Sequence, residues 1–436
     1  MSTVDVVPKL FLQIAVILIV CRMVGVLGRY LGQTQAVCDM VAGIALGPSL
    51  LGVLSSPFQE WLFPQHAVAS GGSVAHPSMS ILYGLSQLGL VLYMFLVGLD
   101  FNTSLFRGRL RSVGLVSLAG IAVPFALGAG AALALVNERA LFPAGIGSWH
   151  AALFIGASMS ITAFPMLARI LHEKGVSGTR VGTMALAAGS LDDVIAWCLL
   201  AITLATLRAE PSIAIVAIVG GVAYTLGMLG IGRPLFRVFA RWTDRDNGLT
   251  SITLLTVLVV LMLSAAFTEA IGIHAVFGAF IAGTALPRGR FAAEMRGHTE
   301  QLITTLLLPL FFVYSGLNTR LALVNTPWLW EVTALVIILA VAGKGIACTA
   351  AARLAGEGWR ESAAIGTLMN ARGLVELIML NIGLQAGVIQ PTLFTIMVMM
   401  AVVTTLMASP LFNLFYGRTL DNHAASTPLR AVLATK

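Results

Sequence analysis

Two short polar segments interrupt the apolar sequence of this chain: Thr162-Ala-Phe-Pro165 and Asn370-Ala-Arg-Gly373. The first ends in a proline and the second in a glycine, and both residue types weaken a helix where they occur. Apolar stretches of helical length surround the two segments, at about 149–171 and 361–385. We therefore expect two interrupted helices, one in each half of the chain.

The composition around these segments is that of a membrane protein. Of the 436 residues, 58% are apolar and only 10% are charged, whereas an ordinary soluble domain carries about 25% charged residues. This excludes a soluble enzyme, a disordered chain, a collagen and a disulfide scaffold. The net charge of +7 fits the basic cytoplasmic loops of membrane proteins better than nucleic-acid binding, so no nucleic-acid partner is expected. The fold class is therefore an all-α polytopic membrane protein in the lipid bilayer.

At about 20 apolar residues per span, the chain divides into about thirteen transmembrane helices, separated by prolines, glycines and charged loops. We expect them near 9–30, 34–54, 79–99, 112–136, 149–171, 177–208, 212–240, 248–268, 271–286, 301–317, 329–354, 361–385 and 391–416. They form a single transmembrane domain over 1–420, and 421–436 forms a short cytoplasmic tail.

The basic residues test this division. With the N-terminus outside, the outer loops receive only Lys9, Arg139, Arg208 and Arg320, and Lys344 and Arg372 lie inside helices. The other 20 of the 26 Lys and Arg residues then lie on the cytoplasmic side. Such an asymmetry predicts a multi-pass protein of the cell (inner) membrane with its C-terminus in the cytoplasm.

The two interrupted helices are the fifth and the twelfth, seven helices apart. Since seven is odd, the two halves have inverted topology, with repeat one at about 9–208, a linker helix at about 212–240 and repeat two at about 248–416. A pair of glycines, Gly43 and Gly47, lies in the second helix, and a similar pair, Gly278 and Gly283, lies seven helices later in the ninth. Interrupted helices at matching positions of inverted repeats indicate a transporter binding site.

A few ionisable residues lie at membrane depth, where each costs about 2.5–3.5 kcal/mol on the insertion scale. They are Asp192 and Asp193 in the sixth helix, Lys344 in the eleventh, and Arg372 and Glu376 in the twelfth. Adjacent carboxylates point about 100° apart on a helix, so one can face a cavity while the other faces a neighbouring helix. A buried carboxylate that holds either a proton or a small cation is the minimal site of an exchanger. The alternative is a pair of carboxylates neutralised by Lys or Arg for structural reasons alone.

The other charged residues each allow two interpretations. Lys344 is the natural counter-charge for one aspartate, or a lysine that extends to the membrane surface. Arg372 and Glu376 form an i, i+4 pair that neutralises itself or takes part in transport. We expect the broken ends to meet near Thr162 and Asn370, with Arg372 and Glu376 offsetting the half-helix dipoles.

Seven stretches resemble the second superfamily of monovalent cation:proton antiporters, which includes Kef-type systems and the plant cation/proton exchangers. They cover nearly the whole chain in order: Gly43–Gly52, Phe95–Asp100, Ser160–Arg169, Leu191–Val194, Gly272–Gly283, Leu308–Leu317 and Met369–Ile378.

The resemblance implies two six-helix inverted repeats with broken, crossing helices, as in sodium/proton antiporters, and a dimer-forming panel beside a mobile core. It implies that Asp193 is the ion- and proton-binding carboxylate, that Asp192 pairs with Lys344, and that Thr162 lies near the ion. Asp192 stands where the plant and Kef-type proteins usually carry Asn or Gln.

The resulting expectation is a secondary active transporter, not an enzyme, that exchanges Na⁺ or K⁺ for protons by alternating access. It is expected to form a homodimer, to need no cofactor, to bind no metal except the transported cation at Asp193, and to carry no nucleotide-binding domain in cis. An intramembrane aspartyl protease would need its two aspartates on facing helices. The alternative that stays open is a cation channel, or a transporter-like sensor, without coupled exchange.

Overall fold

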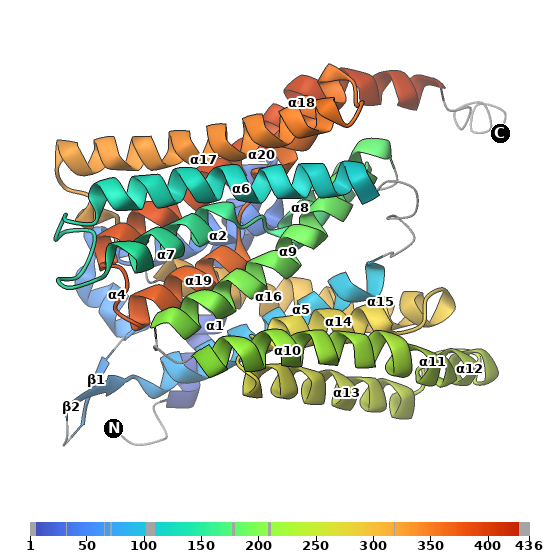
Figure 1. The fold of residues 1–436 in the computed structure, drawn as a ribbon. Helices are drawn as coiled ribbons and strands as arrows, with labels where there is room; N and C mark the ends of the chain where they lie inside the picture. The colour runs from blue at the N-terminus through green and yellow to red at the C-terminus, as the bar shows by residue number, and fades with distance from the viewer. Residues whose placement is uncertain are drawn as a thin grey trace.

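The apolar stretches fold into helices, because a helix satisfies its own backbone groups inside a bilayer. The computed structural model describes residues 6–31, 33–64, 66–69, 72–101, 110–176, 179–207, 211–317 and 319–426. Within these ranges the chain is nearly all helical (Figure 1). Five basic residues of the expected charge asymmetry lie outside the described residues: Arg107, Arg109, Arg208, Arg430 and Lys436. Part of the expected tail, 427–436, also lies outside them.

In the described residues of its first half, the chain forms nine α-helices and one hairpin. They are α1 (Val6–Tyr30), α2 (Gln35–Leu46), α3 (Leu51–Leu54), α4 (Ser56–Leu62), β1 (His66–Ala69), β2 (Gly72–Ala75), α5 (Pro77–Asp100), α6 (Leu110–Leu135), α7 (Ser148–Ser160), α8 (Phe164–Glu173) and α9 (Arg180–Leu207). The antiparallel hairpin pairs His66 with Ala75 and Ala69 with Gly72. It lies in the long loop after the second predicted span, where the sequence predicted no strands.

The segment between the two halves is α10 (Pro211–Gly227), the π-helical turn η3 (Met228–Gly232), α11 (Arg233–Leu235) and α12 (Arg237–Arg245). The second half continues with α13 (Ser251–Ala270), α14 (Ala275–Ala285), α15 (Arg290–Leu302), the π-helical turn η4 (Ile303–Leu307), α16 (Leu308–Leu317), the 3₁₀ turn η5 (Leu321–Leu323), α17 (Pro327–Leu354), α18 (Trp359–Met369), α19 (Leu374–Gln385) and α20 (Pro391–Ser426).

Each of the thirteen predicted ranges contains at least one helix. Among the described residues, nine helical stretches are long and apolar enough to cross a membrane. The other four predicted ranges contain the pairs α7–α8 and α18–α19, the short α14, and α9, which carries the two aspartates. Both predicted interruptions are confirmed, because α7 stops at Ser160 before α8 begins at Phe164, and α18 stops at Met369 before α19 begins at Leu374.

The inverted repeats interlock through close helix crossings. The helix α2 of the first repeat packs on α16 of the second, and α14 of the second packs on α5 of the first. A Cβ atom on Gly43 would lie 2.7 Å from the Cα atom of Val313, and one on Gly283 would lie 2.8 Å from the backbone nitrogen of Leu99. The glycines that recur in the sequence therefore allow backbones from opposite repeats to touch.

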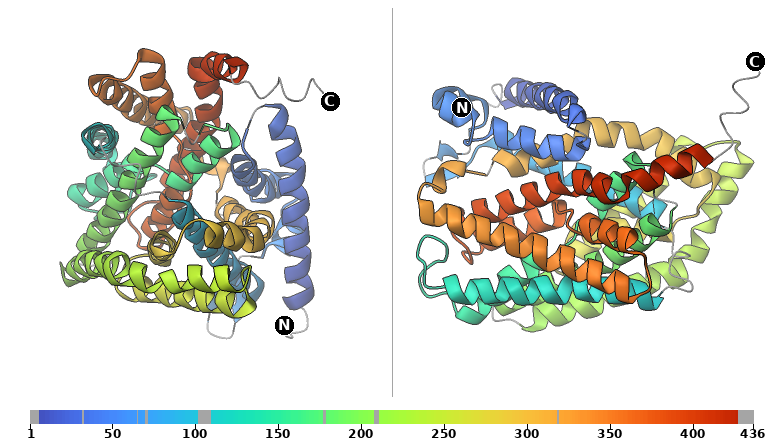
Figure 2. Two further views of the ribbon diagram at one scale, coloured as in Figure 1. Left: turned by 90° about the vertical axis from the view of Figure 1, so that its right-hand side faces the viewer. Right: turned by 90° about the horizontal axis from the view of Figure 1, so that it is seen from above.

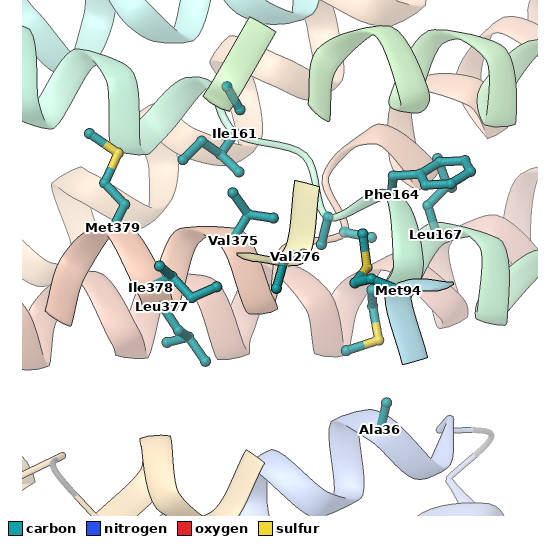
Figure 3. Close-up of a cluster of buried hydrophobic side chains, with 14 of the residues drawn as sticks. Ala36, Met94, Ile161, Phe164, Leu167, Val276, Val375, Leu377, Ile378 and Met379 are labelled. Carbon is teal, nitrogen blue, oxygen red and sulfur yellow. The ribbon is translucent and has the colours of Figure 1, made fainter. Parts of the chain in front are cut away.

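Long helices lie on two opposite sides of the bundle. The helices α6 and α17 pack side by side on one side of the molecule, and α10 and α13 lie on the opposite side (Figure 1). The helix α1 lies at the edge of the bundle (Figure 2). Buried apolar side chains from both repeats, among them Ile161, Phe164 and Val375, surround the place where the interrupted helices cross (Figure 3).

Candidate ion-binding site

The two interruptions meet each other in the middle of the fold. The backbone N–H of Ala163 donates to the carbonyl oxygen of Ala371 at 3.0 Å. The hydroxyl of Thr405, on α20, accepts from the backbone N–H of Arg372 and lies 2.9 Å from its carbonyl oxygen. Inside a membrane protein, backbone groups freed by a helix break must find such partners. The crossing therefore provides partners for some of the backbone groups that the two interruptions leave without a hydrogen bond inside a helix.

Two cations cap the open C-terminal end of α7. The guanidinium of Arg372 donates to the carbonyl oxygens of Ser158 at 3.2 Å and Met159 at 2.7 Å. The ammonium of Lys344, on α17, donates to the carbonyl oxygen of Ser160. The C-terminal end of a helix carries a partial negative charge and unsatisfied carbonyls. Both cations are fully buried, and both come from the second repeat to stabilise a helix end of the first.

Asp192 is held by three partners. Its Oδ1 atom accepts from the hydroxyl of Ser117, on α6, at 2.5 Å. Its Oδ2 atom accepts from the hydroxyl of Thr162 at 2.7 Å and lies 3.6 Å from the ammonium of Lys344. The expected pairing of Lys344 with one aspartate is thus present in the geometry. Thr162, from the interruption itself, contacts Asp192 rather than the adjacent aspartate.

Asp193 is in a different situation, although it is only 4% exposed. The backbone N–H of Phe164, the first residue of α8, donates to its carboxylate. Its Oδ1 atom has no hydrogen-bond partner among the described residues. A buried ionised carboxylate without a partner costs several kcal/mol, so this oxygen is suited to take up a proton or a cation. The two aspartates point to different surroundings, as the helical geometry predicted.

The second interruption places its polar residues close to the first. The side-chain nitrogen of Asn370 donates to the carbonyl oxygen of Gly366 at 3.2 Å, which caps the end of α18. The Oδ1 atom of Asn370 is buried without a partner in the described part of the chain. Glu376 stands in the first turn of α19, and its Oε1 atom lies 3.4 Å from Arg372. Arg372 therefore links this carboxylate to the carbonyls of α7, which is more than the self-contained i, i+4 pair of the sequence analysis.

Sequence reasoning missed two members of the site, Ser117 and Thr405. Both are single hydroxyl residues inside long apolar helices, and both are almost completely buried. Such hydroxyls are common in membrane helices, and most return a hydrogen bond to their own helix, as Thr404 does to Ala401. No local pattern distinguishes the two that reach the site.

The donor atoms beside the crossing are mostly oxygens. Within the described ranges no three His, Cys, Asp or Glu residues lie close enough together to hold a metal ion. The oxygens of a carboxylate are the ligands that hard cations prefer, and Asp193 offers one that accepts no hydrogen bond from the part of the chain that the structure describes.

The fold has inverted repeats, interrupted helices that cross inside the bundle, and a carboxylate pair beside the crossing. Together these features define a secondary transporter of the sodium/proton antiporter fold. A family model described as "Sodium/hydrogen exchanger, transmembrane" matches residues 14–414, and the chain belongs to this family of transporters.

Relatives from bacteria, plants and archaea resemble the chain over most of its length. It is 41% identical over 412 residues to the Na⁺/H⁺ antiporter NhaS4 of Synechocystis, which covers 93% of this chain and 96% of that protein. It is 35% identical to the cation/H⁺ antiporter 18 of Arabidopsis thaliana over 94% of this chain. The chain spans about half the length of that plant relative, 49%.

A solved structure confirms the fold. The sodium proton antiporter MjNhaP1 from Methanocaldococcus jannaschii, determined at pH 8, superimposes with a TM-score of 0.62 over 96% of this chain and 98% of that chain. The sequence identity is 13%, so this likeness concerns the arrangement of helices alone.

Proposed function

We propose that this protein is a secondary active transporter that exchanges a monovalent cation, Na⁺ or K⁺, for protons by alternating access. The observation that carries the proposal is the buried Oδ1 atom of Asp193, which has no hydrogen-bond partner among the described residues. It lies beside the crossing, because Phe164 at the start of α8 contacts the same carboxylate. The names of relatives support the class of substrate, since they include an Na⁺/H⁺ antiporter of Synechocystis and a K⁺/H⁺ antiporter of Saccharomyces cerevisiae that is 31% identical.

In this proposal Asp193 is the carboxylate that binds either the proton or the cation. When it is ionised, its free oxygen binds the cation; when the cation leaves, a proton neutralises the carboxylate, so that the buried charge is never left alone. Competition of the two ions for one oxygen couples their fluxes. A channel would need no such exclusive site.

The neighbouring residues have supporting roles. Asp192, held by Ser117 and Thr162, keeps the ammonium of Lys344 beside the site. Arg372 holds the second interruption against α7, Glu376 pairs with Arg372, and Asn370 caps the end of α18. These contacts hold the two interruptions together beside the carboxylates.

The topology and assembly remain those expected from the sequence. We propose one transmembrane domain in the cell membrane, with the N-terminus outside, the C-terminus in the cytoplasm, and two copies of the chain in a homodimer. The basic residues at one end of the spans support the orientation.

The experiment is dye-monitored proton flux in proteoliposomes, with Li⁺, Na⁺, K⁺ and Rb⁺ added in turn. The wild type should show cation-driven proton movement for at least one of them, and Asp193→Asn should abolish it while the protein stays folded and inserted. Asn is nearly isosteric but cannot lose a proton.

The matched control is Asp39→Asn. Asp39 is also a fully buried aspartate in a membrane helix, α2, and it accepts from the side chain of Gln35 at 2.8 Å. This variant should retain exchange. Normal antiport by purified Asp193→Asn would remove Asp193 from the site, and no cation-driven proton flux in the wild type would refute antiport itself.

A further inference from the structure

Arginines recur at every fourth position where the linking segment ends. They are Arg233, Arg237, Arg241 and Arg245, and residues four apart lie on the same side of a helix. The opposite side of α12 faces the protein, because Phe239 is buried and stacks on Phe291 of α15 with ring centroids 6.1 Å apart. All four arginines are exposed. The segment therefore presents a row of positive charge away from the bundle.

Three of these arginines lack a partner in the described part of the chain. Arg245 lies 3.6 Å from Asp246, and Asp244 stands directly before it in the last turn of α12. No hydrogen bond or ion pair to a described residue involves Arg233, Arg237 or Arg241, which we call the arginine face. Like charges in a row create a positive potential that attracts anions, so this face favours a negatively charged partner.

More positive charge gathers beside the arginine face. Arg288 and Arg290 come from the turn that leads into α15, and Arg290 donates to the backbone and side-chain oxygens of Asn247 at 2.8 and 2.9 Å. Partial burial, and then the nearby guanidinium of Arg233, lower the pKa of Arg288. This end of the linking segment is therefore a site of crowded cations.

The position of the arginine face along its helix indicates the kind of partner. The apolar stretch Ile215–Arg245 has 31 residues, about 46 Å at 1.5 Å per residue, against about 30 Å for the hydrocarbon core of a bilayer. Ile231 and Leu235 are 75% and 68% exposed, as side chains in contact with lipid tails would be. The arginines alternate with these apolar residues and continue past them, which places the arginine face at the depth of the lipid head groups.

We propose that the arginine face of α11 and α12 binds the phosphate groups of anionic membrane lipids such as phosphatidylglycerol. Arginine suits phosphate because its planar guanidinium donates two parallel hydrogen bonds. Since α12 packs on α15, the bound lipid would fix this end of the linking segment, and the helices of the second repeat that it contacts, at one depth in the bilayer. The proposal is independent of ion exchange.

The test uses the full-length protein in a detergent with an uncharged head group. Phosphatidylglycerol or phosphatidylcholine is titrated in, and bound lipid is counted by native mass spectrometry. The double variant Arg237→Gln/Arg241→Gln should lower the affinity for phosphatidylglycerol by at least roughly tenfold, since each cation near an anionic lipid surface is worth a roughly fivefold gain. Arg237→Lys/Arg241→Lys should retain most of it.

The matched control is Arg22→Gln/Arg29→Gln, which removes two exposed arginines from α1 at the same expected side of the membrane. It should bind phosphatidylglycerol as the wild type does. Equal losses of affinity in both double variants, or no loss in either, would overturn the proposal, and no loss would favour an acidic protein segment as the partner.

A measurement on the wild type avoids any folding defect. Retention of phosphatidylcholine equal to that of phosphatidylglycerol, or binding insensitive to high salt, would also overturn the proposal.

Discussion

The backbone N–H of Ala163 donates to the carbonyl oxygen of Ala371 at 3.0 Å, and this bond joins the interruptions of two helices that are 208 residues apart in the sequence. Around it, Arg372 and Lys344 reach from the second repeat to the last carbonyls of α7. Asp192 and Asp193 approach from α9. The charged residues that seemed isolated in the sequence thus form one network around a crossing of broken helices.

The first prediction concerns the support of that crossing. Arg372→Ala leaves the carbonyls of Ser158 and Met159 without their donor and Glu376 without its cation. Removing one partner of a buried pair typically costs about 3–5 kcal/mol. We therefore expect a large drop in the melting temperature of the purified protein, and loss of exchange at temperatures where the wild type is active.

Two further variants show whether the loss of stability comes from breaking the buried charge pair or simply from shortening a side chain. Arg360→Ala removes an exposed arginine at the start of α18 and should change stability by no more than about 0.5 kcal/mol. Glu376→Gln keeps a hydrogen-bond acceptor beside Arg372 and should cost less than Arg372→Ala. If Arg372→Ala and Glu376→Ala each leave stability and transport unchanged, the two residues do not support the crossing.

The second prediction concerns Ser117, whose hydroxyl donates to Asp192 at 2.5 Å. Ser117→Ala removes a hydrogen bond to a charged group, worth about 1.5–3 kcal/mol, and should lower the melting temperature. The comparison is Ser190→Ala, since Ser190 is a buried serine on α9 whose hydroxyl donates to Ala187 of its own helix at 2.8 Å. Equal decreases in the melting temperature of the two variants would mean that the bond to Asp192 stabilises the fold no more than a hydrogen bond within one helix does.

The sequence predicted the interruptions because their breakers are local. Pro165 stands in the first turn of α8, where its missing N–H is not needed, and Gly373 directly precedes α19. The candidate residues Asp192, Asp193 and Lys344 were visible because a charge inside an apolar span is rare. Their roles in transport stay predictions.

The contacts between distant helices could not be derived from local patterns. Thr162 lies next to Asp192 only because the fifth and sixth helices fold against each other, and Ser117 and Thr405 look like any other hydroxyl in a membrane span. The hairpin of β1 and β2 was also missed. Apolar and polar residues alternate only weakly along the hairpin. Each strand pairs over only four residues, which is too short for a clear sequence pattern of a strand.

The third prediction concerns topology. The charge asymmetry places the loop 55–78 outside and the C-terminal end of α20 in the cytoplasm. On a background without cysteines, Ser73→Cys should react with a membrane-impermeant maleimide added to intact cells, and Ser426→Cys should react only after permeabilisation. Labelling of Ser426→Cys in intact cells would reverse the orientation.

The last prediction follows from the pairing of Asp192 with Lys344. Lys344 contacts Asp192 at 3.6 Å and the carbonyl oxygen of Ser160. The Oδ1 atom of Asp193 has no hydrogen-bond partner within the described ranges. If a cation that binds at Asp193 displaces its proton and also breaks the Asp192–Lys344 contact, Lys344 loses its counter-charge in a buried site and releases a proton as well. Two protons then exchange for one cation, and each cycle moves net charge.

We therefore expect wild-type exchange to respond to membrane voltage, because a potential of 100 mV is worth about 2.3 kcal/mol per charge moved. Asp192→Asn removes the counter-charge of Lys344, which then stays neutral throughout the cycle, so that only Asp193 exchanges its proton. This variant should still transport, one proton for one cation, with a rate that no longer follows the voltage. The measurement is exchange in proteoliposomes with the potential clamped by valinomycin and K⁺, or by an ionophore pair that avoids K⁺ if K⁺ is the substrate. Wild-type rates that ignore the clamped potential would mean that the Asp192–Lys344 pair is only structural, and that the exchange is electroneutral with both aspartates in place.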